Sequence, residues 1–163
     1  MGKLSAAQID EYFDTHLPYR TGILLANYRM THDSSTKAPI GWFGDVGQLN
    51  ACFVASLVTG RLFLNLLGIG KDSTGKLCRF NGLPDDVNSE DLGGKFIDLS
   101  SLATADEALF TPFIKMADKA AAHFILPMTH DVSKTHDVIL RIHHYLKVNL
   151  YEHTGRPFKD LIP

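Results

Sequence analysis

The tripeptide Thr-His-Asp occurs three times in this sequence, at residues 31–33, 129–131 and 135–137. Each copy places an imidazole beside a carboxylate, a pair of groups that is common in metal sites, in proton relays and at helix ends. Neutral imidazole together with carboxylate suits zinc or iron. The candidate metal ligands are therefore the histidine and the aspartate of each copy: His32, Asp33, His130, Asp131, His136 and Asp137.

The same residues also have a structural interpretation, which the sequence favours. Thr, Ser and Asp side chains near helix ends cap the backbone N–H groups, and an aspartate in a first turn complements the helix dipole. By this interpretation Asp131 or Ser133 caps the last helix, Asp137 lies in its first turns, and Asp33 belongs to a helix exit. Capping is the preferred role of the triplets, and metal binding is the alternative.

Helical geometry limits which histidines could share an ion. His136 and His143 are two turns apart on one helix, about 10 Å along its axis, too far to ligate one ion together. A metal site would therefore have to recruit His32, His130 or His136, together with Asp33, Asp131 or Asp137, from different elements. The hypothesis depends on whether the fold brings these elements together.

Apolar residues at helical spacing predict four long helical segments. Pro18 interrupts the first, Asp45 is a suitable N-cap for the second, and Thr111-Pro112 suggests a second start within the third. The segments are residues 5–30, 45–67, 104–125 and a last helix from Asp131 or Ser133 to about Gly155. We therefore expect an all-α protein, a four-helix up-and-down bundle with kinked helices, in a single domain over residues 1–163.

Residues from about 70 to 103 form an irregular insertion in this bundle. They are rich in glycine and carry no long periodic pattern. Two alternatives remain open within it: a short helix over Pro84–Leu92, and a small β-ribbon that pairs residues 76–80 with residues 95–99. If the insertion returns the chain to the opposite pole, all three triplets meet at one end of the bundle. If it is a crossover, His32 and His130 end up a helix length apart.

The segment Leu49–Leu67 is apolar on several faces, which is typical of a core helix or an oligomer interface. Small residues that include Gly60 form a strip that lets a neighbouring helix approach closely. Arg61 makes a membrane span improbable, because a central arginine costs about 2.5–3.5 kcal/mol on insertion. A buried Arg61 needs a carboxylate partner, which the sequence does not identify. We expect a homo-oligomer, most simply a dimer.

Composition narrows the class of protein. The formal charge of −2 is too small to favour nucleic acid or an anionic membrane, and 45% apolar residues is ordinary for a globular domain. Two cysteines without a CxxC motif make no disulfide framework, and the first residues lack the apolar core of a signal peptide. A cytoplasmic protein is expected.

Residues 70–77 resemble a phosphate-binding loop, but Leu77 replaces the Ser or Thr that the motif requires to hold a magnesium ion, so nucleotide binding is not favoured.

The leading hypothesis for function is a non-catalytic helical binding or regulatory module, with a protein or small-molecule partner that the sequence does not identify. The competing hypothesis is a metal-binding protein, or a metal-dependent hydrolase that uses a metal-activated water at the Thr-His-Asp triplets. The two differ in whether the triplet side chains bond to nearby backbone or converge on an ion.

Overall fold

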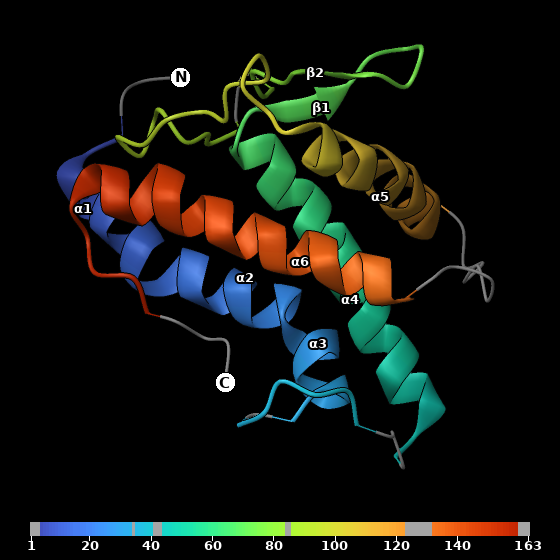
Figure 1. Cartoon of the computed structure of the whole chain (residues 1–163). Helices are drawn as coiled ribbons and strands as arrows, with labels where there is room; N and C mark the ends of the chain where they lie inside the picture. The colour runs from blue at the N-terminus through green and yellow to red at the C-terminus, as the bar shows by residue number, and fades with distance from the viewer. Residues whose placement is uncertain (1–3, 34, 41–43, 84–85, 123–131, 160–163) are drawn as a thin grey trace.

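The structure is a computed structural model that describes residues 4–33, 35–40, 44–83, 86–122 and 132–159. It is mostly helical, with one small two-stranded sheet (Figure 1). The elements in chain order are α1 (Ala6–Glu11), the π-helical turn η1 (Tyr12–His16), α2 (Leu17–Leu24), α3 (Ala26–Thr31), α4 (Val46–Leu66), β1 (Ile69–Lys71), β2 (Leu77–Arg79), α5 (Thr104–Ala122), α6 (Val132–Leu146) and the π-helical turn η2 (Lys147–Glu152).

The first predicted helix is a succession of α1, η1, α2 and α3. Ser5 starts it with a capping box, in which its hydroxyl accepts from the Gln8 N–H and the Gln8 side chain accepts from the Ser5 N–H. Pro18 lies in the first turn of α2, directly after the wider π-helical turn. A second break falls at Leu25, where the backbone leaves ideal helix geometry (φ −85°, ψ −5°). The predicted kink is thus present, at two places.

Helix α4 is the element against which most of the others pack. Asp45 caps it, as predicted, by accepting a hydrogen bond from the Gly47 N–H at 2.7 Å. In Figure 1, α6 runs beside α2 while α4 crosses both obliquely and α5 lies along α4. The helical class is confirmed, whereas the simple up-and-down arrangement of four helices is not.

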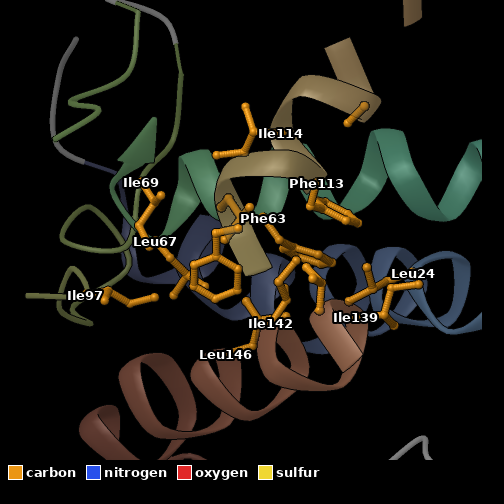
Figure 2. Packing of buried hydrophobic residues seen from close by; sticks show 14 of the residues in the cluster. Leu24, Phe63, Leu67, Ile69, Ile97, Phe113, Ile114, Ile139, Ile142 and Leu146 are labelled. Atoms are coloured by element: carbon orange, nitrogen blue, oxygen red, sulfur yellow. The ribbon is translucent and has the colours of Figure 1, made fainter. Parts of the chain in front are cut away.

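The core is formed by the helices together with part of the insertion (Figure 2). Helices α2, α4, α5 and α6 contribute most of the buried apolar side chains. The segment after α4 adds further apolar side chains, so the insertion is part of the same hydrophobic core. The core residues labelled in Figure 2 are Leu24, Phe63, Leu67, Ile69, Ile97, Phe113, Ile114, Ile139, Ile142 and Leu146.

A β-ribbon does form within the insertion, but its strands pair differently from the prediction. β2 pairs antiparallel with β1, in the register Gly70↔Cys78, instead of with residues 95–99. The local hairpin closes a short loop, which costs less chain entropy than joining more distant segments. Its turn is held by the Asp72 carboxylate, which accepts from the N–H groups of Thr74 and Lys76. Residues 95–99 instead reach the helices: the Ile97 N–H donates to the Leu67 carbonyl.

The short helix predicted over Pro84–Leu92 is also not formed by its described part, residues 86–92. Asn88 explains why, since its side-chain oxygen accepts from the N–H groups of Glu90 and Asp91 and so competes with helical bonding. Ser89 is fully buried and its hydroxyl donates to the Leu66 carbonyl. These bonds fix the segment as turns against the end of α4.

The second helix start predicted at Thr111-Pro112 is wrong, because α5 is one continuous helix with Pro112 inside it. Phe110, on one side of the proline, and Phe113 and Ile114, on the other, are all buried in the core. Burial of such side chains is worth about 1.5–3 kcal/mol each, which outweighs a proline penalty of about 3 kcal/mol. Packing therefore holds the helix together across Pro112.

Gly60 provides the close approach between α4 and α5 that the small-residue strip predicts. A Cβ atom at Gly60 would lie 2.5 Å from the Phe113 ring, whereas a Cβ at Gly22 of α2 would meet nothing within 4 Å. We expect Gly60→Ala to destabilise the protein by about 1–3 kcal/mol through overpacking. Gly22→Ala is the matched control and should stabilise by about 0.5–1 kcal/mol, through helix propensity alone. Urea unfolding of both variants measures this, and equal effects would contradict the packing.

Candidate binding site

The structure brings together two of the three triplet histidines. His32, directly after α3, and His136, on α6, have ring centroids 4.9 Å apart and nearly perpendicular planes (79°). Tyr28 stacks on His32 with a centroid distance of 4.0 Å, and its ring centroid is 5.5 Å from that of His136. His136 therefore lies beside the Tyr28–His32 stack. Sequence reasoning could not reach this contact, because it depends on how α3 and α6 are placed.

Hydrogen bonds define which ring nitrogens carry protons. The Asn27 side-chain N–H donates to the Leu49 carbonyl at 3.3 Å, so its oxygen faces His136 Nε2 at 2.8 Å. Nε2 of His136 is therefore the donor. His32 Nδ1 lies 3.1 Å from the Tyr28 carbonyl oxygen, which can only accept, so Nδ1 is the donor in His32. These assignments follow from the hydrogen-bond network.

His136 is a neutral, buried residue at pH 7. Only 7% of its surface is exposed. Burial, with a smaller contribution from the neighbouring His32, lowers its pKa from 6.5 to about 4. The cluster of Tyr28, His32, His136 and Asn27 thus holds α3, α4 and α6 together, with His136 as its neutral, buried member.

The two described triplet aspartates do not join this cluster. Asp33 accepts hydrogen bonds from the N–H and hydroxyl groups of Ser35 and Thr36, which hold the pKa of its carboxyl far below its usual range. It is a turn cap, as the structural interpretation predicts. Asp137 is exposed on α6, beside Leu140 and Arg141 on a shallow outer surface.

The remaining candidate ligands, His130 and Asp131, lie outside the described residues. Within the part of the chain that the structure describes, no three His, Cys, Asp or Glu side chains are grouped so that they could hold a metal ion. The described triplets therefore supply a pair of imidazoles and two separate carboxylates.

Arg61 has the carboxylate partner that its position requires. Its Nε lies 3.2 Å from Asp118 Oδ1 on α5, and Lys71 Nζ lies 2.5 Å from the other oxygen of the same carboxylate. Burial alone would raise the pKa of Asp118, but these hydrogen bonds and charges lower it. This confirms the ion pair that was favoured for Arg61, which ties α4 to α5 and to the hairpin.

A cleft that the sequence did not predict opens between η1–α2, the second half of α4 and residues 80–83 and 86–88. Its volume is about 240 Å³. The walls are mixed, with aromatic, aliphatic and polar side chains from segments far apart in the sequence. They include Tyr12, His16, Arg20, Thr59, Leu62, Asn65, Leu66, Phe80, Asp86, Val87 and Asn88. The one signal in the sequence was the apolar character of α4 on several faces, because Leu62 is 47% exposed here.

The polar groups of the cleft differ in how far the fold already uses them. Asn65 accepts from the Arg61 guanidinium, and Asp86 accepts from the Leu83 N–H at 2.8 Å. The Asn88 side-chain oxygen accepts hydrogen bonds from the N–H groups of Glu90 and Asp91 within its own turn. Among the described residues, Arg20 has no hydrogen bond or ion pair through its guanidinium. Arg20 is thus the charged group of the cleft that the described fold leaves unused.

Comparison with known proteins finds no family model, no curated protein sequence and no solved structure that matches this chain.

The buried His136 predicts a specific loss of stability in acid. Its pKa of about 4 lies below the unfolded value of 6.5. Between these two pH values the unfolded chain binds a proton at His136, whereas the native state does not, so protonation favours unfolding. The contribution is complete above pH 6.5 and is lost as pH falls towards 4. We expect this loss to be on the order of 2 kcal/mol, since partial solvent access screens some of the penalty.

The measurement is urea unfolding at several pH values between 7 and 4. His136→Gln should lose less stability over this range than the parent, whereas His144→Gln, at an exposed position of α6, should follow the parent. An unchanged acid loss in His136→Gln would show that another group is responsible.

Proposed function

We propose that the protein is a non-catalytic binding module that binds a small molecule in the cleft between α2, α4 and residues 80–83 and 86–88. The observation that supports this proposal is a cleft lined by apolar, aromatic and polar side chains. One of its lining residues, Arg20, makes no hydrogen bond or ion pair through its guanidinium among the described residues. Sites for small molecules are typically concave and largely apolar, with a few polar groups that orient the ligand. The cleft is concave and combines apolar and aromatic side chains with a larger share of polar groups than is typical.

The ligand chemistry follows from the side chains that line the cleft. Tyr12, Phe80 and Leu62 offer apolar and aromatic surface for a flat, partly apolar body. The guanidinium of Arg20 can bind a carboxylate through two parallel hydrogen bonds. A small aromatic or aliphatic carboxylate therefore fits best.

The contacts of His16, the one histidine among the described lining residues of the cleft, agree with binding without catalysis. His16 lies 3.5 Å from Glu11 and its ring contacts Tyr12, with a centroid distance of 5.0 Å. Neither contact activates a hydroxyl or thiol nucleophile, which is what acyl transfer through a covalent intermediate requires.

The test uses benzoate and its neutral analogue benzamide as probes, followed by NMR shifts of the backbone amides of the full chain. We expect benzoate to shift amides around Arg20, Leu62 and Asn88, and to bind more tightly than benzamide. Arg20→Gln should remove the preference for benzoate, because the charged donor is lost.

Leu62→Lys and Val46→Lys form a matched pair on α4. Both positions are exposed apolar residues, 47% and 64%, but only Leu62 lines the cleft. We expect Leu62→Lys to change benzoate binding by tenfold or more, and Val46→Lys to leave it unchanged. Shifts that map outside the cleft, or equal behaviour of the two variants, would refute the proposal.

Metal binding at the histidine pair is the second candidate function. It is supported by the contact between His32 and His136, since each ring donates one N–H to a neutral oxygen and keeps one nitrogen available for an ion. Such hydrogen bonds to the second nitrogen are typical of metal-ligating histidines. A metal-dependent hydrolase would need a third ligand, which the described residues do not supply at this place.

This candidate predicts that Zn²⁺ raises the melting temperature of tag-free protein, and that His32→Ala and His136→Ala abolish the increase. His144→Ala, at an exposed position away from the pair, is the control. No thermal shift with zinc, together with no bound metal in elemental analysis, would exclude metal binding at this pair and leave it a structural contact.

We further propose a homodimer and a cytoplasmic location, as the sequence suggests. Helix α4 is the one described helix long and apolar enough to cross a membrane, and 39% of its most apolar window is buried. Its second half contains buried residues such as Leu57 and Phe63, as in a core helix. Its first half, which includes Leu49 and Phe53, is only partly buried and offers a surface for a second copy.

A further inference from the structure

We propose that Phe13, Tyr151 and Phe158 form an aromatic cage that binds a small quaternary ammonium ion, at a site separate from the cleft. The three rings line a hollow of about 270 Å³ between η1, the start of α2, η2 and the segment after it. Asp14 and Lys159 are the charged residues among the described lining residues. The site goes beyond the proposed function and does not depend on it.

The two π-helical turns of the protein place these rings. η1 carries Phe13 and η2 carries Tyr151, and their ring centroids are 5.1 Å apart at an interplanar angle of 87°. The Phe158 ring lies 4.9 Å from that of Tyr151, at 71°. Steep angles between neighbouring rings form a concave corner instead of a flat stack. π-Helical turns are rare and often occur at functional sites.

Arg156 holds the segment that closes the hollow. Its guanidinium lies 2.5 Å from Asp10 on α1 and 4.4 Å above the Phe13 ring. Its backbone N–H donates to the Tyr151 carbonyl at 2.9 Å. The chain after η2 is thereby fixed against α1 and η1, and the Phe158 ring contacts the rings of Tyr151 and His143.

Charge and ring chemistry together favour a cation. The face of an aromatic ring is negative and attracts cations, and Arg156 over Phe13 shows that one of these rings already does so. The Arg156 guanidinium pairs with Asp10. Asp14 has no ion pair among the described residues. Burial raises the pKa of Tyr151 to about 12; the charge of Asp14 adds to this rise, and the charge of Arg156 opposes it. The negative field of Asp14 therefore reaches the phenol of the cage.

A quaternary ammonium ion fits these walls better than a primary one. An ammonium with N–H groups loses hydrogen bonds to water that aromatic walls do not replace. A quaternary nitrogen has no N–H groups, and its methyl groups pack on apolar rings while its charge interacts with their faces. Lys159 lies at the exposed side of the hollow and opposes a cation, so its removal should strengthen binding.

The experiment compares choline with 3,3-dimethyl-1-butanol, which has the same shape without the charge, by NMR titration of the full chain. We expect choline to bind at least tenfold more tightly, with shifts at Phe13, Tyr151 and Phe158. Phe158→Leu keeps an apolar side chain but removes the ring, and should weaken choline binding about tenfold. Phe80→Leu, at a similarly half-buried ring in the cleft, is the control and should have no effect.

Two charge variants make the test independent of folding defects in the ring variants. Asp14→Asn should weaken choline binding, and Lys159→Gln should strengthen it, while neither changes binding of the neutral alcohol. Equal affinity for choline and the alcohol would show a plain apolar hollow and overturn the proposal. No detectable binding of choline, or identical binding by Phe158→Leu and Phe80→Leu, would overturn it as well.

Discussion

Burial of helix α4 is the constraint on which the rest of the structure depends. Its 21 residues are apolar on several faces, so that α2, α3, α5 and α6 must cover it from different directions. Gly60 allows the Phe113 ring of α5 to approach the α4 backbone, and Arg61 requires Asp118 on the same neighbouring helix. Both conditions fix α5 along the second half of α4. The cleft forms where this covering ends, around the exposed Leu62.

The histidine cluster is a consequence of the same packing. Asn27 bonds to the Leu49 carbonyl of α4 and to His136 of α6, so one amide side chain links three helices. His32 then stacks on Tyr28 and contacts the ring of His136. Repetition of Thr-His-Asp does not reflect one repeated role: Asp33 caps a turn, while His136 is a buried core residue. The surroundings of each copy determine what it does.

Local signals in the sequence predicted the local parts of the fold. Asp45 caps α4 as expected, because a cap bonds to backbone two or three residues away. Arg61 was expected to form an ion pair, but the identity of Asp118 depends on tertiary structure. The ribbon partner of Leu77–Arg79 and the continuity of α5 across Pro112 were predicted wrongly, since pairing and core packing outweigh short patterns there. The cleft and the aromatic cage combine residues from both ends of the chain or from separate helices, and no spacing rule could reveal them.

We propose that this protein binds a small molecule in the cleft beside Leu62. A crystal structure of the full chain grown with benzoate tests this most directly. We expect benzoate in the cleft, with its carboxylate within hydrogen-bonding distance of the Arg20 guanidinium and its ring against Leu62. A cleft without benzoate at saturating concentration, or benzoate bound only elsewhere, would contradict it.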